Sequence, residues 1–339
     1  MRKKSVTLGL QGGGSHGAYT WGVLDRLLEE DRIEIEGISG ASAGAMNAVV
    51  FAHGFTVGGR EGARQALQDF WGAVATKAPF HSILEESSPL VGQGLPASTA
   101  PALKAFLFMT RFFSPYQLNP FDVNPLRDIL VSQLDFGRLR TECKIELFIA
   151  ATRVSTGSLR LFRTRELTVD ALLASACLPT LHHSIEIDGE AYWDGGLSAN
   201  PPVLPLLHRC SADDVILVLL HPSPSTRIPR TAEEIAERLS EISFGATLST
   251  ELQGLMLAQQ EAGRGLFALG RFERRLRRLH MHLIDSPEFM SQLSSLSKAN
   301  RGFSFIKALR DEGRNRAELW LEQNFHLIGV RSTATFANP

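Results

Sequence analysis

The chain has 339 residues, of which 44% are hydrophobic and 21% are charged, a composition typical of a folded globular protein. Its formal net charge of −1 argues against a nucleic-acid partner, because binding to phosphates needs a basic surface. The three cysteines, Cys143, Cys177 and Cys210, lack paired spacing, so neither a disulfide framework nor a cysteine metal site is indicated.

Neither a secretion signal nor a membrane-spanning segment is visible in the sequence. The apolar stretch after the basic N-terminus ends at the glycines of residues 12–14 and is too short for a signal peptide. No run approaches the roughly 20 apolar residues that cross a bilayer. We therefore expect a cytoplasmic protein whose contact with membranes is at most peripheral, while its oligomeric state is not predicted.

In chain order, residues 5–10 predict a short buried strand, which a glycine cluster and a helix follow. A second strand is expected near 33–39 and leads into a helix of small residues. The pattern then predicts helices at 60–77, 124–132 and 168–176, strands at 145–153, 158–163 and 215–220, and a β-hairpin at 184–193. The C-terminal part is predicted to hold a long helix over 231–275 with a break at Gly245, Gly263 or Gly265, a strand at 279–284, and helices at 287–293 and 298–322.

Alternating strands and helices predict an α/β fold with a largely parallel sheet covered by helices on both faces. The decisive motifs lie at both ends of the region 12–202, so we expect one domain over residues 1–339. Its core would span about 5–220, and 221–339 would form a helical extension with one added strand. Residues 80–120 are a candidate cap over the site.

The strongest chemical signal is the sequence Gly-Ala-Ser-Ala-Gly at residues 40–44, between a predicted strand and a predicted helix. This is the context of a nucleophile elbow, in which a sharp turn exposes the serine hydroxyl of Ser42. Gly40 and Gly44 would allow neighbouring backbone to approach closely. The alternative is a plain turn in which Ser42 only caps the following helix.

A glycine-rich loop follows the first predicted strand. The backbone amides of Gly12, Gly13 and Gly14 can converge on an anion there, and in an acyl transfer they would form the oxyanion hole. Together with Gly17, the same glycines also match the G-x-G-x-x-G pattern of dinucleotide-binding loops. That alternative requires an acidic residue at the end of the second strand, where Glu34 and Glu36 come too early.

The candidate base for Ser42 is Asp194, which follows a predicted strand and precedes Gly195 and Gly196. Desolvation by Trp193 and Leu197 would raise its proton affinity above that of an exposed aspartate. A plain Asp-Gly turn is the alternative. A Ser-His-Asp arrangement would instead use His208 or His221, while His182 and His183 are expected to be structural or surface residues.

The combination resembles the patatin-like phospholipase family, whose members carry a glycine-rich oxyanion loop, a G-x-S-x-G serine and a D-G-[GA] aspartate in that order. Residues 174–179, Ala-Ser-Ala-Cys-Leu-Pro, are similar to the family's A-S-x-A-x-P segment. The resemblance covers about residues 5–220. It implies a three-layer α/β/α domain and hydrolysis of acyl esters by a Ser42–Asp194 dyad, without a metal or other cofactor.

Two positions depart from the family pattern. His16 stands where Arg or Lys is usual, which would weaken an anion contact there or make it pH-dependent, and Cys177 replaces a common alanine. The resemblance implies a lipid or acyl-ester substrate. It leaves phospholipase, lysophospholipase, esterase, storage-polyester hydrolase and acyltransferase activities open, as well as a catalytically silent regulatory module.

Two segments are candidates for membrane contact. Residues 101–113 are rich in phenylalanine and predict a mobile cap with an apolar face, or else a core helix over the site. Five arginines between residues 271 and 278 form a basic cluster that would suit anionic head groups, although such a run is more often a solvated helix end.

Overall fold

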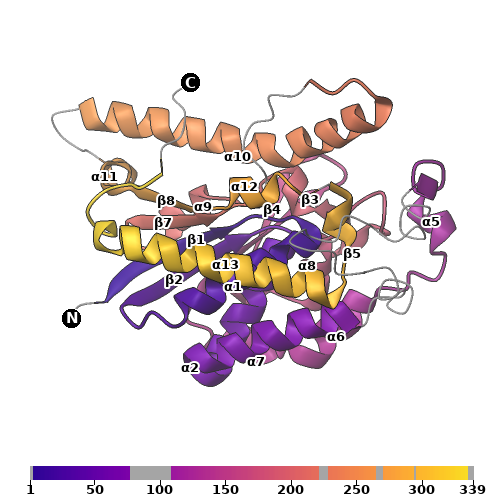
Figure 1. Ribbon diagram of the computed structural model, residues 1–339, viewed down its shortest axis with the longest axis horizontal. Helices are drawn as coiled ribbons and strands as arrows, with labels where there is room; N and C mark the ends of the chain where they lie inside the picture. Colours follow the sequence, from indigo (N-terminus) through magenta and orange to yellow (C-terminus); the bar gives the residue numbers. More distant parts are fainter. Residues whose placement is uncertain (1–2, 77–107, 221–227, 265–269, 294, 335–339) are drawn as a thin grey trace.

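The computed structural model describes residues 3–76, 108–220, 228–264, 270–293 and 295–334. Within these ranges, eight strands form one sheet in the order β5-β6-β3-β2-β1-β7-β8, with β4 paired to β3 (Figure 1). The strands are β1 Lys4–Leu10, β2 Ile33–Gly40, β3 Glu146–Arg153, β4 Leu159–Arg163, β5 Ile185–Ile187, β6 Glu190–Asp194, β7 Asp214–Val218 and β8 His280–Ile284.

Helices connect the strands and cover the sheet. The α-helices are α1 Gly17–Leu27, α2 Ala43–Thr76, α5 Pro115–Leu118, α6 Pro125–Gln133, α7 Phe136–Glu142, α8 Val169–Ser175, α9 Leu204–Arg209, α10 Ala232–Arg264, α11 Arg271–Arg278, α12 Pro287–Met290 and α13 Phe303–Asn324. Short 3-10 helices are η1 Gly14–His16, η2 Thr164–Glu166, η3 Gly195–Leu197, η4 Ser295–Ala299 and η5 Phe325–Leu327. Among the residues described, no helix has both the length and the apolar character needed to cross a bilayer.

The sheet separates two layers of helices, which confirms the predicted three-layer α/β/α class. Side chains of a strand alternate between its two faces, and β7 shows the consequence. Ile216 and Val218 pack into the core under α1, α2, α8 and α13, whereas Val215 and Leu217 pack into a second core under α9, α10 and α11. Because β7 is buried on both faces, its sequence is an unbroken apolar run.

Pairing within the sheet is mostly parallel, as predicted. Strands β3, β2, β1, β7 and β8 run parallel to their neighbours, and β4, β5 and β6 are antiparallel additions at one side. The glycine loop therefore follows β1, and the serine turn follows the adjacent β2. Both emerge at the carboxyl edge of the parallel strands, where α/β folds bind their ligands.

Strands β2 and β6 share one edge of β3. Gly40 at the end of β2 pairs with Ile149, and Asp194 at the end of β6 pairs with Ala151. The two strands approach from opposite directions, because β2 is parallel to β3 and β6 is antiparallel to it. Their ends are thus two β3 residues apart, or about 7 Å along the strand. This register brings the segments after Gly40 and around Asp194 together.

The C-terminal elements join the same sheet and core. Strand β8 extends the sheet beyond β7, and α13 lies along α1 (Figure 1). At the helix crossing, a Cβ on Gly22 would overlap the carbonyl of Arg310, and one on Gly313 would overlap the carbonyl of Tyr19. The two backbones can approach this closely only because both positions are glycine.

The helices expected after the second strand and at 60–77 are both present as the two segments of α2, which non-helical backbone at Gly58 and Gly59 separates. In the C-terminal part, α10 runs through Gly245 and Gly263 and ends at Arg264. Gly265, the third candidate break, lies outside the described residues, as does most of the expected cap segment before residue 108.

Candidate active site

Ser42 occupies the turn between β2 and α2 with a backbone φ of 52°, in the left-handed region that β-carbon-bearing residues seldom adopt. Its N–H donates to the carbonyl oxygen of Ser175 at 3.1 Å and to the Ser175 hydroxyl at 3.0 Å. The flanking glycines are sterically required, since a Cβ on Gly44 would overlap the Leu10 carbonyl and one on Gly40 would lie 2.6 Å from Gly44. The turn thus has the geometry of a nucleophile elbow.

Asp194 ends β6 and is fully buried. Its N–H donates to the Cys177 carbonyl at 2.8 Å, and its own carbonyl accepts a 2.8 Å hydrogen bond from the Thr152 hydroxyl. On the side chain, Oδ1 accepts the N–H of Gly196 at 2.7 Å. Asp194 is therefore held in place by hydrogen bonds of its backbone N–H, its backbone carbonyl and one carboxylate oxygen.

The second carboxylate oxygen, Oδ2, is buried and accepts no hydrogen bond of ordinary geometry from the described residues. Burial raises the pKa of Asp194 to about 7, against smaller lowering effects of the Gly196 N–H and of the nearby Ser42 hydroxyl. Ser42 is thus close enough to act on this carboxylate electrostatically, although the contact is looser than a formed hydrogen bond. Catalytic pairs commonly tighten only when substrate is bound.

The segment 174–179 connects the two candidate residues. Ser175 accepts the Ser42 N–H, and two positions later the Cys177 carbonyl accepts the Asp194 N–H. Cys177 itself is buried and donates its thiol to the His183 carbonyl at 2.9 Å. The cysteine in place of the family's common alanine therefore changes a buried packing position. Ser42 and Asp194 are held by backbone atoms and by Ser175, which this change does not affect.

The glycine loop lines the same cavity as Ser42, and one of its three amides is bonded to a side chain of the protein. The N–H of Gly12 donates to Asn200 Oδ1 at 2.7 Å. Of the three amides expected to form the oxyanion hole, that of Gly12 is therefore already engaged. Within the described chain, the amides of Gly13 and Gly14 donate to no other residue. Asn200 is fully buried and also donates to the Phe244 carbonyl of α10 at 3.1 Å. It therefore clamps the loop between the sheet and α10.

The supporting glycines have steric roles. A Cβ on Gly195 would overlap the Ala150 carbonyl of β3, and one on Gly196 would lie 2.5 Å from the Phe244 ring. A Cβ on Gly17 would lie 2.7 Å from the Cβ of Ala43. These glycines let the glycine loop, the serine turn and the aspartate loop pack against one another.

A cavity of about 990 Å³ opens over these residues. Ser42, Asp194 and the three loop glycines line it. Its apolar wall comes mainly from α2, α6 and residues 176–181, and is formed by Met46, Phe70, Trp71, Val74, Leu126, Ile129, Ala176, Leu178 and Leu181. Charged or titratable side chains also line it: Arg111, His182, Glu237, Glu241, Lys298 and Arg301. The cavity can hold an apolar chain next to a polar group.

Sequence reasoning missed part of this cavity. Lys298 and Arg301 lie far beyond the motifs and outside any recognisable pattern, and burial lowers the pKa of both. Arg301 makes no hydrogen bond or ion pair with another described residue. Asn200 could have been suspected from its position after Asp194 and Gly195, whereas Ser175 was part of a recognised segment without a role.

The histidine alternative finds no support at Asp194. His208 lies on α9 and lines a different cavity, and His221 lies outside the described residues. His183 hydrogen-bonds the Pro115 carbonyl and stacks on Tyr116, consistent with a structural role. His182 does line the Ser42 cavity, contrary to expectation, but it donates no hydrogen bond to Asp194 among the described contacts.

The dinucleotide alternative also fails on geometry. Glu36 is occupied by the amides of Ser211 and Ala212 and by the Ser211 hydroxyl, at 2.6–2.7 Å, near the opposite end of β2 from the glycine loop. His16 is not among the residues that line the cavity, and its Nε2 pairs with the Ser297 hydroxyl at 2.7 Å.

The fold belongs to the α/β proteins that bind ligands at the carboxyl ends of parallel strands. Residues 8–207 match the family described as Patatin-like phospholipase. The match spans more than half of the chain, so the protein belongs to the patatin-like phospholipase family, which implies a lipid acyl hydrolase. Comparison with curated proteins finds no match.

Two solved structures are weakly similar to the chain. VipD from Legionella pneumophila shares 14% identity over 95% of this chain and 67% of that chain, with a TM-score of 0.45. A chain of the heterodimeric ExoU-SpcU complex from the type III secretion system of Pseudomonas aeruginosa shares 14% identity over 96% of this chain, with a TM-score of 0.39. The aligned region spans 52% of that second chain.

Proposed function

We propose that the protein hydrolyses lipid or fatty acyl esters through an acyl-enzyme on Ser42, with Asp194 as the general base. The observation that carries the proposal is the unpaired, buried Oδ2 of Asp194 beside a serine in a strained turn. A fully buried carboxylate without a cationic partner is costly unless it has a chemical use. Its raised pKa suits a base that works near neutral pH.

In the acylation step, Asp194 accepts the proton of Ser42 as Oγ attacks the ester carbonyl. Negative charge then develops on the carbonyl oxygen, where the unpaired amides of Gly13 and Gly14 can donate to it. The N-terminus of α2 begins directly after Ser42 and adds a favourable dipole. The protonated Asp194 gives its proton to the departing alcohol, which leaves the acyl group on Ser42.

Deacylation repeats the same steps with water. Asp194 removes a proton from a water molecule, which attacks the acyl carbonyl, and the proton returns to Ser42 Oγ as the fatty acid leaves. An alcohol in place of water would complete an acyl transfer, which is the acyltransferase alternative. Product analysis in the presence of a soluble acceptor alcohol distinguishes the two outcomes.

The cavity composition supports an amphipathic substrate. Its apolar wall suits the acyl chain, while Lys298 and Arg301 suit a negatively charged group at the other end of the ester. Burial lowers the pKa of both, and Glu241 and Glu237 partly offset this effect at Lys298. An anion bound beside Arg301 would therefore offset the cost of burying its charge. These contacts favour a phosphate-bearing lipid over a neutral ester.

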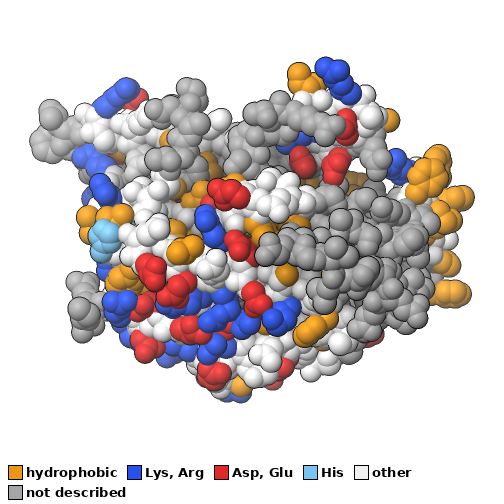
Figure 2. All heavy atoms as spheres, viewed as in Figure 1, with side chains coloured by type: hydrophobic (Ala, Val, Ile, Leu, Met, Phe, Trp, Pro, Cys, Tyr) orange, Lys and Arg blue, Asp and Glu red, His pale blue; other side chains and the backbone are white. Residues whose placement is uncertain are grey.

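Access from a membrane surface is supported by exposed aromatic residues near the cavity. Thr110 and Arg111 line the cavity, and the chain around them carries large exposed apolar side chains. Those side chains are Phe108, Met109, Phe112, Phe113, Tyr116, Phe121 and Val123. Figure 2 shows hydrophobic side chains gathered at the end of the molecule where Figure 1 places α5. Such a patch is characteristic of an interaction site.

The arginine cluster of α11 is a weaker candidate for membrane contact. Arg275 is buried and donates to the Ala212 carbonyl at 2.8 Å, Arg277 lies 3.4 Å from Glu273, and Arg278 lies 3.5 Å from Asp213. Three of the five arginines are thus engaged within the protein. We therefore propose that the aromatic patch, rather than α11, contacts lipid.

Hydrolysis of short and long p-nitrophenyl esters and of phospholipid vesicles tests the activity. We expect Ser42→Ala to lose turnover of all of them. Ser243→Ala, which removes an exposed hydroxyl on α10, should retain it. A catalytically silent regulatory module would give no turnover in the wild type either, and activity retained in Ser42→Ala would refute the proposed nucleophile.

Vesicle binding tests the aromatic patch separately. Phe112→Ser with Phe121→Ser should weaken binding to anionic vesicles while leaving turnover of short soluble esters unchanged. Val57→Ser with Val330→Ser removes two exposed valines elsewhere and serves as the matched control. Equal vesicle binding by the two double variants would show that the patch is not the contact surface.

A further inference from the structure

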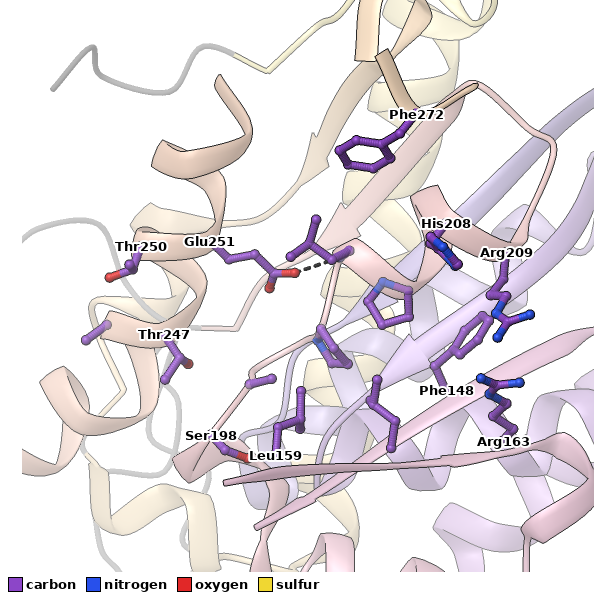
Figure 3. A pocket seen from close by; sticks show the side chains of 16 residues that line it. Phe148, Leu159, Arg163, Ser198, His208, Arg209, Thr247, Thr250, Glu251 and Phe272 are labelled. Atoms are coloured by element: carbon purple, nitrogen blue, oxygen red, sulfur yellow. Dashed lines mark hydrogen bonds between the residues drawn. The ribbon is translucent and has the colours of Figure 1, made fainter. Parts of the chain in front are cut away.

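A second cavity of about 980 Å³ lies on the opposite face of the sheet from α1 and α13, and it shares no lining residue with the Ser42 cavity. Figure 3 shows it between β4, α9 and α10, with Phe272 of α11 above. Nothing in the proposed hydrolysis uses this space. Its lining chemistry differs between its two ends.

The floor is apolar. Alternate residues of β4 point to one face, so Leu159 and Leu161 line the cavity in a row that continues to Arg163. Leu204 on α9 and Phe272 on α11 also face it, and they remain 45% and 41% exposed. Large apolar side chains left open around one hollow gain free energy when an apolar ligand covers them.

One end of the cavity is cationic. Arg163 is the cross-strand partner of Phe148, and Figure 3 shows Arg163 and Arg209 reaching toward each other beside the Phe148 ring. Among the described residues, neither guanidinium forms a direct ion pair. Glu166, which Arg160 binds at 2.6 Å, also accepts the Arg163 backbone N–H at 3.0 Å and lies close enough to interact with the Arg163 charge. Two guanidinium groups that face each other repel, and they stay charged at any physiological pH.

The nearby carboxylates leave this end with an excess of positive charge, because Arg160 and Arg163 share Glu166. Among the described residues that line the cavity, Glu251 is the one acidic residue, and its Oε1 accepts the amides of Val203 and Leu204 at 2.9 and 2.6 Å. Figure 3 shows Glu251 on α10, away from the two arginines. The cationic end is therefore complementary to an external anion.

We propose that this cavity binds a long-chain fatty acid, with its carboxylate between Arg163 and Arg209 and its chain over Leu161 and Leu159. Two arginines can each donate paired N–H groups to the oxygens of one carboxylate. The row of β4 side chains leads directly from the cationic end along the apolar floor. A ligand with one anionic end and a continuous apolar tail satisfies both features.

Photoaffinity labelling with a palmitic acid that carries a diazirine and a terminal alkyne tests the site, at concentrations below micelle formation. We expect crosslinked peptides that contain residues 204–209 or 246–251, with crosslinking suppressed by palmitate. 1-Hexadecanol, which has the chain but neither the charge nor an ester bond to hydrolyse, should compete about tenfold or more weakly. Crosslinks in α2 or residues 174–182 report the Ser42 cavity instead, so the test does not depend on the proposed hydrolysis.

Arg163→Gln with Arg209→Gln should weaken palmitate binding at the α9 and α10 peptides about tenfold or more. Arg165→Gln with Arg331→Gln removes two exposed arginines outside the cavity and is the matched control. Thermal unfolding of both variants checks that they remain folded. Palmitate affinity equal in the two double variants, or equal competition by 1-hexadecanol, overturns the proposal. If inorganic phosphate competed as well as palmitate, the cavity would be an anion site that does not recognise the acyl chain, and this result would also overturn the proposal.

Discussion

Asp194→Asn tests the physical basis of the proposed base, because it replaces a buried carboxyl by a neutral group of the same shape. A pKa of about 7 in the folded protein, against 3.8 for an ordinary aspartate, corresponds to on the order of 4 kcal/mol. The folded state keeps its proton to higher pH than the unfolded chain does. Ionisation therefore destabilises the fold increasingly from about pH 4 to pH 7, and by a constant amount above that.

The amide removes this penalty but weakens the hydrogen bond from the Gly196 N–H, which a carboxylate accepts more strongly. We expect Asp194→Asn to be more stable than the wild type by roughly 2–4 kcal/mol at pH 8. The gain should shrink by about 2–3 kcal/mol between pH 8 and pH 5. At pH 8, ester turnover by the variant should be about 10²–10⁴-fold below that of the wild type because the base is lost, and the difference should narrow toward pH 5, where the wild-type base is itself protonated.

Equilibrium urea unfolding of wild type and variant at pH 5 and pH 8 measures this difference. Asp188→Asn is the control, since Asp188 is exposed at the β5–β6 turn with a φ of 53°, a conformation that asparagine also tolerates. It should change stability by less than about 0.5 kcal/mol at either pH. If Asp194→Asn were instead less stable than wild type at pH 8, the carboxylate would be stabilised by its surroundings and the desolvation account would be wrong.

Further outcomes follow from the same geometry. kcat/KM for a soluble ester should rise with pH with an apparent pKa near that of Asp194, about 7, since only the ionised base is active, and a profile flat from pH 5.5 to 8.5 would contradict this. Asn200→Ala should lower kcat by roughly tenfold or more and the free energy of unfolding by about 1–3 kcal/mol, because it frees the Gly12 loop and leaves a buried amide unpaired. Unchanged kinetics and an unchanged urea unfolding curve would show that Asn200 does not hold the loop in place. Gly195→Ala should cost more than about 3 kcal/mol, measured by urea unfolding, because its Cβ overlaps the backbone of β3. Arg301→Gln should raise KM for anionic phospholipid about tenfold and leave p-nitrophenyl acetate turnover unchanged, and equal effects on both substrates would exclude a head-group role.

Much of the fold is predictable from local pattern. The unbroken apolar run of β7 indicates a strand buried on both faces, and the glycine-flanked Ser42 indicates a strand-turn-helix. The extent of α10 was less predictable, because isolated glycines such as Gly245 interrupt a helix only where packing or strain demands it. Local sequence carries no such information.

The candidate site is predictable in its parts but not in its assembly. Ser42 lies between Gly40 and Gly44 after β2, and Asp194 ends β6 directly before Gly195, which marks them individually. Their proximity depends on β6 pairing antiparallel with the same edge of β3 that β2 uses, a register set by long-range packing. The occupation of the Gly12 amide by Asn200, from 188 residues away, is likewise a tertiary contact without a local signal.

The most direct test of the central claim is covalent labelling by a fluorophosphonate followed by peptide mass spectrometry. The account predicts a single adduct on Ser42 in the wild type and in Ser243→Ala, none in Ser42→Ala, and slow labelling in Asp194→Asn because the hydroxyl then lacks its base. Labelling of Ser42→Ala at the wild-type rate, or an adduct on another residue of the wild type, would contradict the Ser42–Asp194 dyad.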